Sequence, residues 1–315
     1  TRFPGQGEFR GPTKQSGVMV QLLANAPELK HPDPKIEKAR EKPKKDAAKE
    51  EDGKKKDEDN PKDKVTVEVR DSNGAIIRTF RRDVHLGLNR IYWRFERDGG
   101  PGPNRTFQKK PKMPPAGRRV LAGTYELTIR FQGESQTVKV EVLDDPRVSI
   151  SRAASVAKDV LRTEREQLNK RLYEVTQRLA PIKGQIDVVR SRLAIEQKPE
   201  AGDDPLKVIR EALKAIDKAH ETLTNKIWGE QKKVQGISRG NDGLMTKVRT
   251  HMRISGSIDK PNKTERDGMA KAVTQVGEIE ALAAAFFENA LPTFRKAVVD
   301  SGLHLLPVEP SSSRK

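Results

Sequence analysis

Apolar residues follow two different periods along this chain, and the change from one period to the other divides it. Between Val65 and Val142 they alternate with polar residues, as in a half-buried strand. From Leu161 onward they recur every three or four positions, as in an amphipathic helix. The sequence therefore predicts a β domain that gives way to a helical domain near residues 145–147, an arrangement that favours scaffolding or binding over catalysis.

The alternating region predicts about six short antiparallel strands. Asn73-Gly74 is expected to form a tight hairpin turn, and Gln132-Gly133 is expected to form another. Trp93 is the largest apolar side chain available to fill the space between two sheets. An earlier apolar run, residues 17–23, is short and β-branched enough to be a strand, and it is counted among these six. This pattern favours a β-sandwich over a barrel or a parallel sheet.

The helical region carries a seven-residue repeat typical of a coiled-coil-like seam. Its two series are Leu161, Leu168, Val175, Ile182 and Val189, and Leu172, Leu179, Ile186 and Leu193. Pro181 lies within the repeat and is expected to kink or break the helix because it lacks a backbone donor. Such a seam is more often the interior of the protein's own bundle than a docking stripe for a partner.

Three further helices are predicted after this one. Asp204 is placed to cap a second long helix, antiparallel to the first, with Pro205 in its first turn. A shorter amphipathic piece follows at about 242–253, and Thr264 begins a last long helix. Together they predict an up-and-down α-helical bundle, so the fold class is α+β, a sandwich followed by a bundle.

These patterns suggest five regions along the chain. A Lys/Glu-rich tract has almost no residue able to enter a core, so burial cannot offset the entropy of ordering it, and we expect it to be a disordered insertion. The expected regions are 1–30, an N-terminal segment that contributes a strand to the β domain; 31–64, the disordered insertion; 65–147, the sandwich; 148–306, the bundle; and 307–315, a flexible tail.

Composition narrows the class of protein. The chain has 62 Lys and Arg against 45 Asp and Glu, a formal charge of +17, which invites a nucleic-acid partner. The surplus is spread thinly over the chain, however, with no basic stripe interleaved with aromatic residues, so a nucleic-acid partner is not favoured. Only 34% of residues are hydrophobic and 4% aromatic, which predicts slender cores.

No stretch approaches the ~20 apolar residues that a membrane-spanning helix needs. The chain starts at Thr1 without an initiator Met or the apolar part of a signal peptide, so we expect a mature or truncated product. It has no Cys, which excludes disulfides and thiolate metal sites and leaves the redox compartment undecided.

No motif for catalysis, cofactor binding or metal binding is present in the sequence. The five histidines are isolated: none has another histidine or a carboxylate at the sequence spacing of a metal-binding motif. His220 lies on an apolar heptad position, which is typical of a packed histidine. The paired carboxylates 144–145 and 203–204 stand at boundaries where capping or linker roles explain them. We therefore expect no catalytic residue, no cofactor and no metal.

One region is a candidate for ligand contact. Residues 99–122 are rich in Gly and Pro with little periodicity, as in a long surface loop, and such loops often carry binding contacts. The candidate ligand-contact residues are the basic side chains of this loop: Arg105, Lys109, Lys110, Lys112, Arg118 and Arg119. If they hold a polyanion, binding should weaken steeply as ionic strength rises.

Four stretches carry a family resemblance when they are taken in order. The series is D-x-x-G, G-x-N-R-x-x-W, A-G-T-Y and D-P-R, at Asp71–Gly74, Gly87–Trp93, Ala122–Tyr125 and Asp145–Arg147. It resembles the C-terminal region of bacterial BNR-repeat, sortilin-like (VPS10-like) β-propeller proteins over roughly residues 15–300. The resemblance implies an Ig-like β domain, similar to the one in flagellar hook-capping proteins, followed by a helical tail.

The resemblance also implies a setting and a role. The family's propeller would precede Thr1, and no S-x-D-x-G-x-T-W box occurs here. We expect a non-catalytic accessory or scaffold module of an exported protein, periplasmic, cell-surface or secreted, whose partners are an N-terminal β-propeller and other cell-envelope proteins or polysaccharide. The alternatives are a polysaccharide- or polyanion-binding domain, or the accessory part of a glycoside-hydrolase-like enzyme whose active site lies in the propeller.

Overall fold

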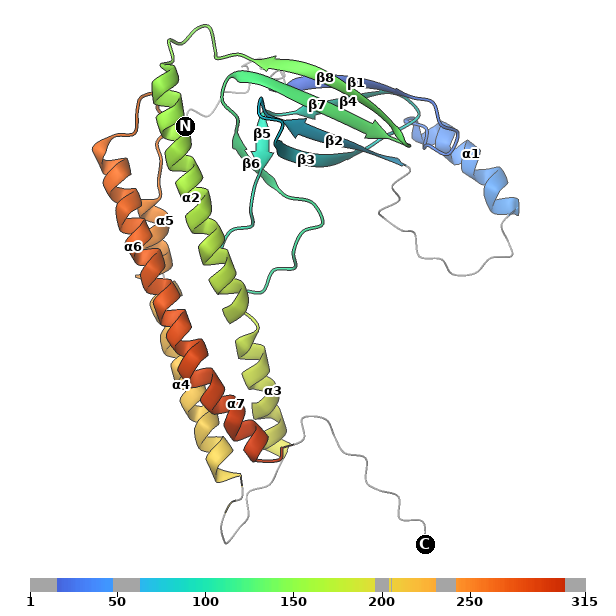
Figure 1. The fold of residues 1–315 in the computed structure, drawn as a ribbon. Coiled ribbons are helices and arrows are strands. Elements are labelled where there is room, and N and C mark those ends of the chain that lie inside the picture. The colour runs from blue at the N-terminus through green and yellow to red at the C-terminus, as the bar shows by residue number, and fades with distance from the viewer. Residues whose placement is uncertain (1–15, 48–62, 196–203, 205, 231–241, 304–315) are drawn as a thin grey trace, which may run out of the picture. The chain divides into compact units, whose positions relative to one another are not determined.

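The computed structural model describes residues 16–47, 63–195, 204, 206–230 and 242–303 (Figure 1). The chain is a mixture of helix and strand whose sheets are antiparallel, as the α+β prediction requires. It divides into two compact units. The β unit comprises residues 1–99 and 112–148, and the helical unit comprises 149–315 together with the excursion 100–111, which comes from the middle of the β region.

The β unit contains three antiparallel sheets. The largest has the strand order β3-β2-β7-β8, a second pairs β1 with β4, and a third pairs β5 with β6. The strands are β1 (Val18–Ala24), β2 (Lys64–Arg70), β3 (Ile76–Asp83), β4 (Gly87–Trp93), β5 (Glu96–Asp98), β6 (Ala116–Arg119), β7 (Gly123–Phe131) and β8 (Glu134–Val142).

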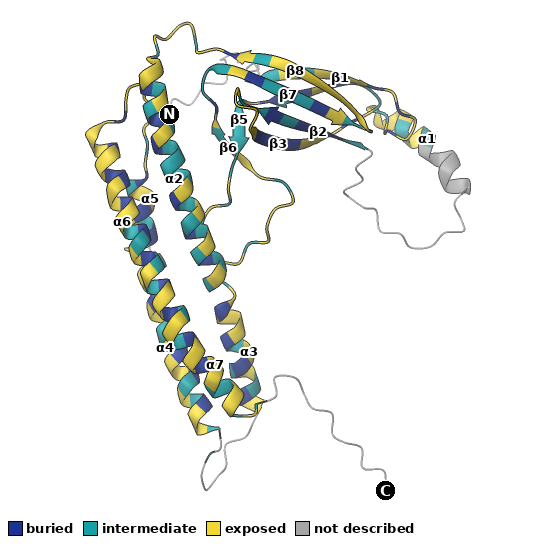
Figure 2. Ribbon diagram, viewed as in Figure 1, coloured by how far each residue is buried: buried dark blue, intermediate teal, exposed yellow. Residues whose placement is uncertain are grey.

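A single apolar core joins the β1–β4 pair to the four-stranded sheet. Strand β2 shows the alternation most clearly, because every second side chain from Val65 to Val69 is buried (Figure 2). Trp93 of β4 is only 2% exposed, which confirms its predicted core role. Its ring meets the edges of Phe95 and Tyr125 at centroid distances of 5.6 and 5.4 Å, the T-shaped arrangement that aromatic pairs prefer.

The two predicted hairpin turns differ in how they close. Gln132 and Gly133 both have positive φ, the pattern of a two-residue turn that matches strand twist. At Asn73-Gly74 only the glycine has positive φ, so the prediction of positive φ angles across that pair is wrong. The reason is Asp71, whose carboxylate accepts the N–H groups of Asn73 and Ala75 and closes a longer turn.

The Lys/Glu-rich tract differs from its predicted disorder in its first half. Residues Pro34–Ala47 form helix α1, while residues 48–62 lie outside the described part. Tethering explains the difference: Arg40 donates hydrogen bonds to the carbonyls of Leu29 and Pro27 and pairs with Glu37 one turn earlier. Hydrogen bonds to the preceding loop therefore stabilise this helix, although the tract has few apolar residues to bury.

The helical unit is built from long helices that share one apolar core. Its elements are α2 (Arg152–Leu179), α3 (Ile182–Ile195), α4 (Lys207–Trp228), α5 (Leu244–His251), α6 (Lys263–Ala285), the π-helical turn η2 (Phe286–Ala290) and α7 (Leu291–Asp300). Figure 1 shows α4 running opposite to α2 and α3, as predicted. None of the helices in the described ranges is long and apolar enough to cross a bilayer.

The heptad positions line this core. Leu168, Leu172 and Ile186 are at most 2% exposed, and the helix breaks between Leu179 and Ile182, where Pro181 was expected to interrupt it. On α6, Ala272 is fully buried and Val273 is 38% exposed, so the buried face of the helix passes through Ala272 at that turn.

A π-helical turn lies between α6 and α7. The N–H of Leu291 bonds to the carbonyl of Phe286, five residues earlier, and Pro292 follows at once. Proline has no N–H, and its ring needs room beside the carbonyl four residues before it, so a widened turn accommodates it without ending the rod. The turn also carries Phe286, which is buried against α4.

A buried lysine ties α2 to the segment between α5 and α6. Lys158 is 2% exposed, and its ammonium donates to carbonyl and hydroxyl oxygens of Ser255 and Ser257 at 2.5–3.2 Å. Glu265 accepts the N–H groups of Ser255 and Asn262, and Asn262 in turn caps α6. The capping box and Lys158 together satisfy backbone hydrogen-bonding groups of a segment that belongs to no helix or strand.

Candidate functional site

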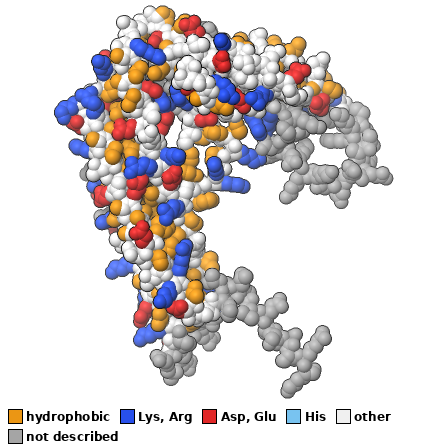
Figure 3. Space-filling model, in the orientation of Figure 1, with side chains coloured by type: hydrophobic (Ala, Val, Ile, Leu, Met, Phe, Trp, Pro, Cys, Tyr) orange, Lys and Arg blue, Asp and Glu red, His pale blue; other side chains and the backbone are white. Residues whose placement is uncertain are grey.

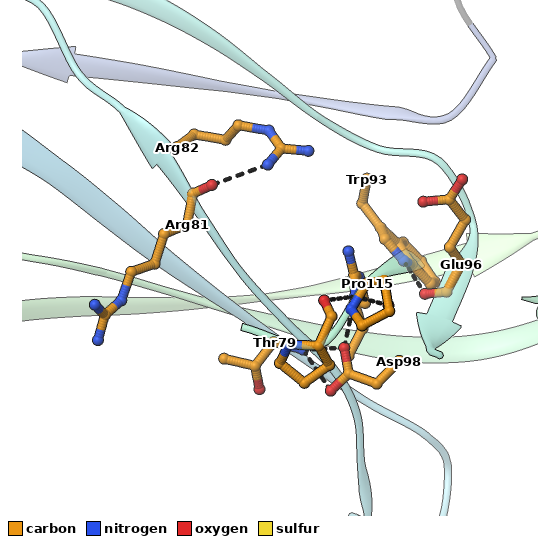
Figure 4. A network of polar contacts seen from close by, with 9 residues as sticks. Thr79, Arg81, Arg82, Trp93, Glu96, Asp98 and Pro115 are labelled. Atoms are coloured by element: carbon orange, nitrogen blue, oxygen red, sulfur yellow. Dashed lines mark hydrogen bonds and ion pairs between the residues drawn. The ribbon is translucent and has the colours of Figure 1, made fainter. Parts of the chain in front are cut away.

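The candidate contact loop leaves the β unit from a firmly held stem. Arg78 of β3, 6% exposed, donates to the carboxylate of Asp98 at 2.7 Å and to the carbonyls of Pro114 and Pro115 at 2.9 and 2.8 Å. Figure 4 shows Asp98 beside Thr79, whose N–H also donates to that carboxylate. One guanidinium thus joins the strand that enters the loop to the segment that leaves it.

Two glycines let the stem strands come close together. A Cβ on Gly99 would lie 2.9 Å from the carbonyl oxygen of Ala116, and one on Gly117 would lie 2.8 Å from that of Asp98. Both distances are below any ordinary contact, so the backbones touch where side chains would separate them. The Gly-rich composition of this region therefore serves a close crossing as well as a loop.

Beyond the stem, residues 100–111 pack within the helical unit. The N–H of Gln108 donates to the side-chain oxygen of Gln177 on α2 at 3.1 Å, and Arg249 of α5 donates to the carbonyl of Pro103 at 3.3 Å. The loop is thus held against two helices rather than standing free in solvent.

The loop and the helices line a half-open cavity of about 940 Å³. It lies beside the break between α2 and α3 and along the second half of α4, with residues 104–107 as another wall. The lining residues are Asn104, Arg105, Thr106, Phe107, Thr176, Leu179, Ala180, Lys183, Arg190, Asp217, His220, Glu221, Thr224, Asn225, Ile227, Trp228 and Glu230.

Most of the charge on the α3 side of the cavity is paired internally. Asp217 accepts from Lys183 at 3.3 Å and from Arg190, which also pairs with Asp187. Burial alone would raise the pKa of Asp217, but the hydrogen bonds from Arg190 and Lys183 outweigh it and lower that pKa. The two cations of this part of the lining, Lys183 and Arg190, are therefore engaged by Asp217, and Arg190 is engaged as well by Asp187 outside the lining.

Three polar side chains of the lining have no partner within the described residues. Arg105 and Glu221 make no ion pair there, and the side-chain amide of Asn225 makes no hydrogen bond. The three come from the loop and from α4, so their hydrogen-bonding capacity is available to a bound molecule.

Aromatic rings complete the cavity. Trp228 ends α4, where Gly229 takes up a positive φ, and the guanidinium of Arg249 lies 5.9 Å from its ring. Phe107 of the loop is 63% exposed. Half-buried His220 meets the edge of Phe286 at 6.1 Å, and desolvation, with a smaller contribution from Lys183, lowers its pKa, so the imidazole is neutral at pH 7.

The structure distributes the six predicted contact residues between the two units. Arg105 lines the cavity, and Lys109 and Lys110 are exposed on the same loop within the helical unit. The other three belong to the β unit, where Arg119 of β6 lies opposite Glu96 of β5. They are Lys112, Arg118 and Arg119.

Charge on the surface is mixed rather than concentrated. Figure 3 shows Lys and Arg side chains interspersed with Asp and Glu over the face in view, with no broad field of one sign. Within the described residues, no three His, Asp or Glu side chains lie where they could hold a metal ion together.

Comparison with known proteins adds no relative. The chain matches no protein-family model, no curated protein and no solved structure.

Proposed function

We propose that this chain is a non-catalytic module that binds and positions other molecules within a larger exported bacterial protein. The cavity in the helical unit is the observation that carries the proposal, because it combines internally paired charges with free polar groups, exposed Phe107 and half-buried Trp228. A binding site needs such groups to fix and orient a ligand. The N-terminal β-propeller implied by the family resemblance is the proposed partner.

We further propose that the β unit is an Ig-like sandwich and the helical unit an up-and-down bundle. The first is supported by the core that β1–β4 shares with the four-stranded sheet, around Trp93. The second is supported by the antiparallel course of α4 against α2 and α3 and by their common core. Both are rigid frames on which a binding surface can be held.

Turnover measurements test the non-catalytic part of this proposal. The purified chain is assayed against a panel of glycans and peptides, and no substrate should be consumed. Robust turnover that a single cavity substitution, such as Glu221→Gln, abolishes would contradict the proposal and favour an enzyme.

The partner is tested separately. Reading the coding sequence upstream of Thr1 should reveal a β-propeller, and that propeller should co-elute with residues 1–315 in size-exclusion chromatography. A start codon and export signal directly before Thr1 would contradict the partner and the family resemblance together.

A second candidate function is polysaccharide or polyanion binding through the loop. Its support is that residues 104–107 form one wall of the cavity. A polyanion is the weaker form of this candidate, because Arg105 alone among the six basic residues lines the cavity and the other lining cations are paired.

A further inference from the structure

We propose that the cavity of the helical unit binds a short uncharged oligosaccharide. This inference rests on the proposed binding function and names the chemical class of its ligand. Three properties of the cavity support it: its balance of charge, the kind of groups that its walls can offer, and its aromatic rings.

Charge balance excludes strongly charged ligands. Lys183 and Arg190 are engaged by Asp217, and the remaining unpaired cation, Arg105, is matched by the unpaired carboxylate of Glu221. A polyanion would be attracted by Arg105 but repelled by Glu221, and a cation would be attracted by Glu221 but repelled by Arg105. An uncharged ligand rich in hydroxyl groups can instead donate to the carboxylate and accept from the guanidinium.

The helical walls offer side chains rather than backbone, and the remaining wall, residues 104–107, is not a strand. Helices α2, α3 and α4 use their own N–H and C=O groups internally, so an extended peptide cannot add to them as a strand. A helical peptide would need an apolar groove, whereas five lining residues are apolar among many polar ones. Carboxylate, amide and hydroxyl side chains such as Glu221, Asn225 and Thr224 match the hydroxyl groups of a sugar.

Aromatic rings supply the apolar contact that a sugar ring needs. Phe107 is exposed although it is large and apolar, and Trp228 is half-buried with its indole N–H unbonded to any described residue. An aromatic face with a polar edge suits a ligand that has one apolar face and a hydroxyl rim. The volume of about 940 Å³ falls near the upper end of the ~300–1,000 Å³ typical of small-molecule sites.

Calorimetry on the whole chain tests the proposal, with cellotriose, maltotriose and chitotriose as uncharged probes and trigalacturonate as the charged one. At least one uncharged probe should bind saturably, with an affinity that changes little between about 50 and 300 mM salt. Binding of none of them, or binding of trigalacturonate alone with steep salt dependence, would overturn the proposal.

Cavity variants locate the site. Phe107→Ala and Asn225→Ala should each weaken binding by roughly tenfold, the size expected for one lost aromatic or polar contact. Val160→Ala on α2 is the matched control, because Val160 is also 63% exposed but does not line the cavity. Equal affinities in all three variants would place the sugar elsewhere and overturn the assignment.

Fluorescence gives a second readout. Trp93→Phe leaves Trp228 as the only tryptophan, so its emission should change as the sugar fills the cavity. An unchanged emission at saturating sugar would contradict the proposed position.

The outcomes separate this proposal from the function on which it rests. Cleavage of a bound probe, detected by chromatography, would contradict the non-catalytic function and leave the ligand class standing. Absence of sugar binding in a chain that still co-elutes with its propeller would overturn the ligand class and leave the positioning function standing.

Discussion

Each unit buries one basic side chain within its described residues, and the two are held differently. Arg78 of the β unit meets the carboxylate of Asp98 directly, together with two backbone carbonyls. Lys158 of the helical unit donates only to neutral oxygens, those of Ser255 and Ser257, and the nearby Glu265 accepts the backbone N–H of Ser255 instead. Both cations fasten an irregular segment to a regular element.

The difference concerns what remains when the cation is lost. Without Arg78, the carboxylate of Asp98 stays partly buried and loses its direct ion pair. Without Lys158, neutral oxygens lose their donor, and the nearby carboxylate of Glu265 loses only a minor electrostatic contribution because it keeps the N–H groups of Ser255 and Asn262. Residual charge, rather than the number of hydrogen bonds, should therefore set the cost.

The largest effect should come from the two cores. Trp93→Ala should destabilise the β unit by roughly 3–5 kcal/mol, and Leu172→Ala should destabilise the helical unit by roughly 2–5 kcal/mol, because each side chain is at most 2% exposed. The first variant keeps only Trp228, which lies in the helical unit, and the second keeps both tryptophans. Hydrogen exchange followed by mass spectrometry along a denaturant series reads the strands and the helices separately and should resolve the two transitions in both variants.

A single coincident transition in both variants would show that the two units unfold together. The comparison between them would then lose its meaning.

The buried cations should rank next. Arg78→Met should cost about 3 kcal/mol, since it leaves the Asp98 carboxylate uncompensated. Lys158→Met should cost about 2 kcal/mol, since it leaves neutral oxygens unsatisfied. Denaturant midpoints of each unit measure both values, and Arg78→Lys serves as the control that keeps the charge but loses the planar donor group. The reverse ranking would contradict the role given to residual charge.

Glu265 should make the helical unit sensitive to acid. Burial alone would raise the pKa of this carboxyl, but the N–H groups of Ser255 and Asn262 outweigh it and hold the pKa below its usual 4.5. A lowered folded-state pKa adds stability that is present above pH 4.5 and is lost as the pH falls through the folded value. Melting temperatures from about pH 5 to about pH 3 should fall less steeply in Glu265→Gln than in the wild type.

The matched control is Glu278→Gln, an exposed glutamate on the same helix, which should retain the wild-type slope. An unchanged slope in Glu265→Gln would show that the carboxylate of Glu265 does not stabilise the segment between α5 and α6.

The smallest effect should come from the surface pair of Asp145 and Arg147. The side-chain and backbone hydrogen bonds of Arg147 lower the pKa of Asp145 to about 2, yet both groups lie in solvent, where water and salt screen them. Asp145→Asn should leave the melting temperature unchanged at neutral pH, in low and in high salt. A clear drop in the melting temperature would show that Asp145 makes a stabilising contact other than its pair with Arg147.

The sequence predicts much of the fold because its apolar periods are regular. Val65–Val69 and the seam through Leu168 and Leu172 are buried as their spacing requires. Helix α1 was not predicted, because composition does not reveal that Arg40 reaches the carbonyls of the preceding loop. The π turn before Pro292 also has no periodic signature of its own.

The candidate site was harder to predict. Of the six basic residues chosen from the loop, Arg105 lines the cavity, and Glu221, Asn225 and Trp228 of α4 were not chosen. Apolar periodicity identifies the inward side of α4 and is silent on its polar side. A sequence signal for this wall is Trp228 before Gly229, because glycine commonly ends a helix and tryptophan combines a large apolar ring with a polar N–H.

Neither unit is one continuous stretch of chain, because residues 100–111 pack with the helices while their neighbours on both sides belong to the strands. A gene divided between codons 148 and 149 would therefore not yield two whole proteins. The C-terminal product would lack Asn104, Arg105, Thr106 and Phe107, and with them one side of its cavity. The shorter product should therefore fail to bind the ligand in a screen. Fusing a copy of residues 100–111 to it should restore binding.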